Sequence, residues 1–151
     1  MIRTLIAAFL LAALPLAAPT AFAEKPPVYT GVLSNLAVGG YDPVAYFRQG
    51  APVRGNPQHR IVHQGFEYRF ASAENLAAFR QNPNAYLPQY GGYCAWAVAH
   101  GYTASADPNA WRIVDGKLYL NYNAEIQGRW AQDIPNLIRQ GDANWPSVLQ
   151  R

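Results

Sequence analysis

The chain has 151 residues, of which 50% are hydrophobic, and a formal net charge of +3 at pH 7. This length and composition suffice for one domain with its own core. So small a charge excludes the strongly basic surface of a typical nucleic-acid-binding protein. The single cysteine rules out an intramolecular disulfide.

The first 23 residues are typical of an export signal. Arg3 precedes an apolar run over residues 5–14 that is too short to span a membrane. Ala21-Phe22-Ala23 then fits the small-x-small rule for cleavage. We predict a signal peptide over residues 1–23 and a mature protein that is periplasmic or secreted from a bacterium. No stable membrane span is expected after cleavage, and a retained anchor is the less favoured alternative.

The mature chain is predicted to contain a flexible leader over residues 24–34 and one domain over residues 35–149. Two hairpins are expected, because runs of strand-forming residues flank dipeptides that favour tight turns. The first pairs residues 60–62 with 66–70 across Gln64-Gly65, and the second pairs 111–114 with 117–122 across Asp115-Gly116.

Side chains on each hairpin are expected to divide between two faces. Opposed pairing in the first hairpin sets His63 against Phe66 and Ile61 against Tyr68. In the second hairpin, one face, predicted to be the core face, carries Trp111, Ile113, Leu118 and Leu120.

Short helices are predicted between and after the hairpins. Ser72 and Asn123 are suited to cap helices over residues 73–81 and 124–132. A short buried helix is expected over 93–100. Asp133 is suited to cap a last helix that stops at Gly141. The sequence therefore predicts a small single-domain α+β fold with two β-hairpins and several short helices.

Cys94 is the first candidate for chemistry. It follows Gly91-Gly92 at the start of a predicted helix, and a thiol near a helix N-terminus has its pKa lowered by the helix dipole. A free cysteine is equally typical of a buried core position. Three interpretations of Cys94 stay open: a buried structural residue, a metal ligand, and a redox or nucleophilic centre.

A metal site centred on Cys94 needs a further ligand, and thiolate with imidazole suits copper. His63 is the best placed histidine, because it shares the face of the first hairpin that is expected to meet the helices. His100 is closer in sequence, but a spacing of six residues on a helix turns it away from Cys94. A histidine near the C-terminal end of a helix is also explained by the helix dipole alone.

Aromatic residues gather between positions 86 and 102. Tyr90, Tyr93 and Trp96 are candidates for binding a small apolar or cationic ligand on a concave surface. The alternative is that these rings fill the core of a domain with few aliphatic residues.

Two motifs resemble the YHS-domain family: Asp42-Pro43-Val44-Ala45, and Phe70-Ala71-Ser72-Ala73-Glu74-Asn75. With the run from Gln89 to Ala95, the chain is similar to a secreted bacterial subgroup in which some members are described as selenoproteins, with Cys94 at the matching position. The resemblance implies metal binding. Metal-linked YHS modules carry cysteines in the two motifs, however, and Ala45, Ala71 and Asn75 stand at those positions here.

The sequence as a whole predicts an exported YHS-like binding module rather than an enzyme, with a metal ion such as copper, or a small ligand, as its partner. Motifs of serine hydrolases, zinc proteases, P-loop proteins, dithiol oxidoreductases and haem attachment are absent from the sequence. Two alternatives stay open: a thiol-based redox protein centred on Cys94, and a structural or interaction domain without metal.

Overall fold

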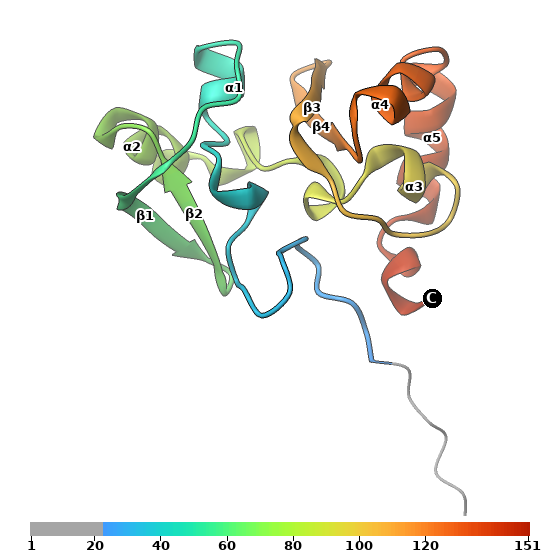
Figure 1. Cartoon of the computed structure of the whole chain (residues 1–151), viewed down its shortest axis with the longest axis horizontal. Helices are drawn as coiled ribbons and strands as arrows, with labels where there is room; N and C mark the ends of the chain where they lie inside the picture. The colour runs from blue at the N-terminus through green and yellow to red at the C-terminus, as the bar shows by residue number, and fades with distance from the viewer. Residues whose placement is uncertain (1–22) are drawn as a thin grey trace, which may run out of the picture.

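Two antiparallel hairpins organise the fold (Figure 1). In the computed structural model, which describes residues 23–151, β1 (Asn56–His63) pairs with β2 (Phe66–Phe70), and β3 (Asp107–Val114) pairs with β4 (Lys117–Asn121). Short helices surround both hairpins, so the α+β prediction is confirmed. The predicted signal peptide lies, except for Ala23, outside the described residues.

The turns of both hairpins form as their dipeptides predict. The central residues have positive φ in each turn, 52° and 89° at Gln64 and Gly65 and 50° and 72° at Asp115 and Gly116. Positive φ at both positions is the mark of the type I′ turn that fits twisted strands. The predicted pairing of His63 with Phe66 is also confirmed.

The helices are short, and side chains cap two of them as predicted, whereas the Asp133 side chain makes no capping hydrogen bond at the start of the last helix. Ser72 accepts a hydrogen bond from the Asn75 amide at 3.1 Å, and Asn123 accepts one from the Ile126 amide at 2.8 Å. The α-helices are α1 (Ala45–Arg48), α2 (Ala73–Gln81), α3 (Ala95–Ala99), α4 (Ala124–Trp130) and α5 (Ile134–Asn144). The 3-10 turns are η1 (Val38–Gly40), η2 (Pro83–Ala85), η3 (Gln89–Gly92) and η4 (Ser147–Gln150).

The last helix is longer than the sequence predicts. The expected stop at Gly141 is wrong, because α5 continues to Asn144. Gly141 serves packing instead: a Cβ atom there would lie 2.5 Å from the hydroxyl oxygen of Tyr90. The helix therefore carries a glycine where the Tyr90 side chain passes closest to its backbone.

Strand β4 lies between two hydrophobic clusters. Leu118 and Leu120 belong to the first cluster, which contains residues of β2 and α2, with Trp111 and Ile113 packed against it as predicted. Tyr119 points the other way, into the second cluster, which contains residues of α3, α5 and η4. Figure 1 shows β1, β2, α1 and α2 gathered on one side of the molecule, and β3, β4, α3, α4 and α5 on the other.

The segment predicted as a leader makes specific contacts with the C-terminal half. The Lys25 amide donates to the Leu149 carbonyl, and the Tyr29 amide donates to the Gly91 carbonyl, both at 2.9 Å. The Tyr93 hydroxyl donates to the Pro26 carbonyl at 2.9 Å. Within residues 23–151, no helix has the length and apolar character that a membrane crossing requires.

Candidate functional site

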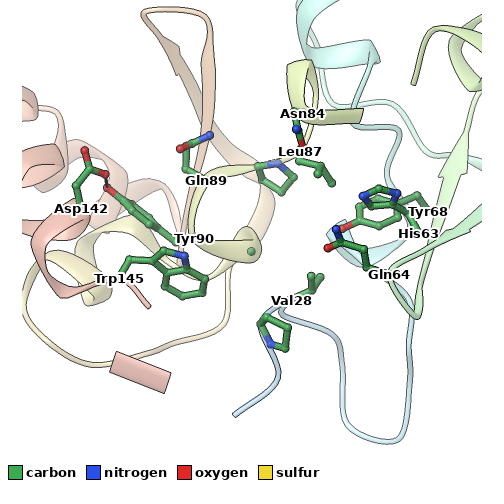
Figure 2. Close-up of a pocket in the computed structure, with 13 residues that line it drawn as sticks. Val28, His63, Gln64, Tyr68, Asn84, Leu87, Gln89, Tyr90, Asp142 and Trp145 are labelled. Atoms are coloured by element: carbon green, nitrogen blue, oxygen red, sulfur yellow. Dashed lines mark hydrogen bonds between the residues drawn. The ribbon is translucent and has the colours of Figure 1, made fainter. Parts of the chain in front are cut away.

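A cleft with a volume of about 510 Å³ lies between the first hairpin and the C-terminal end of α5 (Figure 2). Four segments that are far apart in the sequence line it: the N-terminal segment at Pro27 and Val28, the end of the first hairpin, residues 84–91, and the end of α5. A cavity of this size is in the range of small-molecule sites. We refer to it below as the cleft.

His63 and Tyr68 form the wall of the cleft on the first hairpin (Figure 2). The imidazole packs edge-on against Phe79, with ring centroids 5.7 Å apart. Its Nε2 atom is buried and has no hydrogen-bond partner within the described residues. Buried polar atoms without a partner are uncommon in folded proteins, so this nitrogen is an unsatisfied group directly behind the wall.

Tyr90, Asp142 and Trp145 form the opposite wall (Figure 2). The Tyr90 hydroxyl donates a hydrogen bond to Asp142 Oδ1 at 2.9 Å, and its ring centroid lies 5.9 Å from that of Trp145. Burial, and then the hydrogen bond to Asp142, raise the pKa of Tyr90 well above its usual value. The hydroxyl therefore stays protonated and fixes the carboxylate that it contacts.

The backbone at Tyr90 is held in an unusual conformation. Tyr90 has φ 56° and ψ 35°, in the left-handed region that residues other than glycine rarely adopt. Gly91 follows with φ 60°, and a Cβ atom there would lie 1.9 Å from the Pro27 carbonyl oxygen. Strained residues of this kind persist only where the surroundings hold them, and they cluster at functional sites.

Cys94 lies away from the cleft, at the N-terminal end of α3. It is 1% exposed, and its thiol donates a weak hydrogen bond to Asn121 Oδ1 at 3.6 Å. Burial raises the pKa of the Cys94 thiol, although the backbone amides of Ala97, Tyr122 and Trp96 oppose the shift. The raised pKa disfavours the thiolate, the form that reacts and binds metals.

We expect Cys94 to react slowly with iodoacetamide in the folded protein near neutral pH. The rate should rise as the pH is increased, because only the thiolate attacks and its pKa is raised. Mass spectrometry of timed samples, with and without denaturant, measures the effect. Rapid labelling of the folded protein at neutral pH would instead support the redox interpretation.

The two histidines predicted as metal ligands lie in different surroundings. His63 packs on rings of the first cluster, whereas the His100 ring stacks on Trp96 at 4.2 Å, with Nδ1 2.7 Å from the Trp96 carbonyl oxygen. Within residues 23–151, no group of three or more His, Cys, Asp or Glu side chains is arranged to hold a metal ion. Metal binding through Cys94, His63 and His100 stays a prediction.

The predicted aromatic ligand-binding residues separate between two places. Tyr90 lines the cleft, whereas Trp96 lines a small apolar pocket of about 190 Å³ next to Cys94. Tyr93 is buried and packs against Tyr29 and Trp145, with ring centroids 5.5 and 6.2 Å away. Of the three, only Tyr90 contributes to the cleft.

Asp42 joins the two motifs on which the YHS resemblance depends. Its buried carboxylate accepts hydrogen bonds from the amides of Val44 and Ala45 at 2.8 and 3.2 Å. It also accepts bonds from the Ala71 amide at 2.8 Å and from Asn75 Nδ2 at 2.7 Å. Ala45, Ala71 and Asn75, which stand where the family carries cysteines, are thus gathered around one carboxylate.

Comparisons with protein-family models, curated proteins and solved structures found no match. Membership of the YHS family therefore stays a prediction that rests on the motifs. The site includes Asp142, in the last turn of α5, and Trp145, which directly follows that helix. The sequence analysis missed both, because it ended the last helix at Gly141.

Proposed function

We propose that this protein is an exported YHS-like binding module that holds a small, hydrogen-bonding molecule in the cleft. The observation that carries the proposal is the cleft itself, in which polar side chains from distant segments face one space. These are His63, Gln64, Asn84, Gln89 and Asp142, set among aromatic and apolar side chains. A mixed lining of this kind, with a few polar groups to orient a ligand, is typical of small-molecule sites.

The cleft favours binding over catalysis. No serine, threonine, cysteine or lysine is among its lining residues in the described part of the chain, so the usual nucleophiles are missing. The Tyr90 hydroxyl is committed to Asp142 and its pKa is raised. His63 and Asp142 stand on opposite walls (Figure 2) and make no acid–base pair in this structure.

Mapping of the amide chemical shifts during a screen of small polar fragments tests the proposal. Binding fragments should shift the amides of Gln64, Gln89 and Asp142 together, because these residues line one space. Fragments that gather instead around Trp96 and Tyr102, in the pocket beside Cys94, would contradict it.

Variants that fill the cleft provide the control for this screen. Val28→Trp and Asn84→Trp place a large ring at its lining and should abolish the common shifts. Val32→Trp introduces the same ring at a residue that is 95% exposed, and binding should persist. Thermal unfolding shows which variants remain folded. A loss of binding is interpreted only for the variants that do.

Copper binding is kept as the alternative that the sequence resemblance implies. A Cys94-centred site would need the buried thiol to lose its proton, and a site that includes His100 would also need its ring to leave the Trp96 carbonyl. Metal analysis of protein purified from the periplasm, before and after Cys94→Ser, tests this alternative. Stoichiometric copper that disappears in the variant would favour it over an organic ligand.

A further inference from the structure

The cleft contains a single full charge, and that charge is negative. Asp142 is the only aspartate, glutamate, lysine or arginine among its lining residues in the part of the chain that the structure describes. An anionic ligand would meet this carboxylate with no cation to offset it. A ligand that carries a positive charge is therefore favoured over an anion of the same size.

The backbone around Asp142 carries partial negative charge, the same sign as its side chain. Asp142 lies in the last turn of α5, an eleven-residue helix that ends at Asn144. The free carbonyls at the C-terminal end of a helix carry partial negative charge, which favours a cation there. The hydrogen bond from Tyr90 holds one carboxylate oxygen at 2.9 Å and leaves the second for a ligand.

Aromatic rings stand next to this negative end of the cleft. Trp145 and Tyr90 both line it, and Figure 2 shows their rings on the same wall as Asp142. Tryptophan and tyrosine faces attract cations. Asp142 itself is exposed, so water screens its part of the attraction and the rings supply the rest. Since the close approach of Tyr90 to Gly141 fixes the tyrosine ring, this part of the wall is already in place without a ligand.

We propose that the cleft binds a small organic cation, with its ammonium group at Asp142, Tyr90 and Trp145. The remainder of the ligand carries a hydroxyl or amide group, which the side chains of Gln64 and Gln89 are suited to bind. The volume of about 510 Å³ leaves room for a ligand larger than the ammonium group alone. This inference rests on the proposed function and specifies its ligand class.

Matched pairs of small molecules test the inference. Choline and 3,3-dimethylbutanol have nearly the same shape, but only choline carries a charge. We expect choline to shift the Trp145 indole N–H resonance and to bind about tenfold more tightly than the neutral alcohol, from cation–π and carboxylate contacts. Ethanolamine and agmatine extend the test to primary ammonium and guanidinium groups.

Two variants that each remove one negative charge separate a local effect from a general one. Asp142→Asn should remove most of the preference for choline, whereas Asp115→Asn, at the exposed turn of the second hairpin, should leave it unchanged. The net charge of the protein changes equally in both variants, so a difference between them reports the position of Asp142.

The possible outcomes distinguish this inference from the proposed function. Equal binding of choline and the neutral alcohol in the cleft would overturn the cation proposal and leave the binding site in place. Failure of all three cations to bind would overturn it as well. If, in addition, the polar fragments do not bind the cleft, the proposed function also fails.

Discussion

Replacing Asp42 by alanine is expected to lower the free energy of unfolding by about 3–5 kcal/mol. The carboxylate is fully buried and accepts hydrogen bonds from Val44, Ala45, Ala71 and Asn75. Its removal leaves buried hydrogen-bond donors without an acceptor. The hydrogen bonds that join the start of α1 to the start of α2 are lost as well. Urea unfolding, followed by circular dichroism, measures the change.

Two further variants show whether the charge and its hydrogen bonds are responsible. Asp42→Asn keeps the size of the side chain but turns an NH₂ group toward the donors, so it should still cost about 2 kcal/mol or more. Glu74→Ala removes an exposed carboxylate next to Asn75 and should cost less than about 1 kcal/mol. If Asp42→Ala cost no more than Glu74→Ala, the network would have no important role in stability.

The second large effect is expected for Gly91→Ala, which should lower the free energy of unfolding by about 2–4 kcal/mol. The new Cβ atom would lie 1.9 Å from the Pro27 carbonyl oxygen, so the N-terminal segment must move away. The hydrogen bond from the Tyr29 amide to the Gly91 carbonyl would be lost with it. Because Pro27 and Val28 line the cleft, ligand binding should weaken at the same time.

Gly50→Ala is the matched control for this variant. Gly50 has φ 64°, close to the 60° of Gly91, but a Cβ atom there meets nothing within 4 Å. It should show only the penalty for a left-handed alanine, about 1 kcal/mol. Hydrogen exchange at the Tyr29 amide should accelerate in Gly91→Ala alone. Equal effects of the two variants would mean that contact with the N-terminal segment is unimportant.

Local patterns in the sequence predict much of this fold. Gly116 and Gly65, with Asp115 in the second turn, tolerate the positive φ that the two hairpin turns require. Ser72 and Asn123 cap helices through bonds to amides three residues on. These features depend on neighbours in the chain, so they can be recognised without the tertiary structure. Gly141 misleads the same reasoning, because its role is to make room for Tyr90 rather than to end a helix.

The candidate site is harder to predict, because its parts are distant in the sequence. Val28, His63 and Asp142 meet only when the N-terminal segment, the first hairpin and α5 pack around one cavity. Among the predicted site residues, Tyr90 and His63 line that cavity, whereas Cys94 is buried elsewhere. The position of Cys94 at the start of a helix predicts a lowered thiol pKa. Burial raises that pKa instead, and burial depends on the tertiary structure.

The proposed function requires a ligand to occupy the cleft between the first hairpin and the end of α5. The most direct measurement is of intermolecular nuclear Overhauser effects between the N-methyl protons of choline and the aromatic protons of the protein. We predict contacts with Trp145 and Tyr90, the rings beside Asp142. Contacts with Trp96 and Tyr102, in the pocket beside Cys94, would contradict the claim.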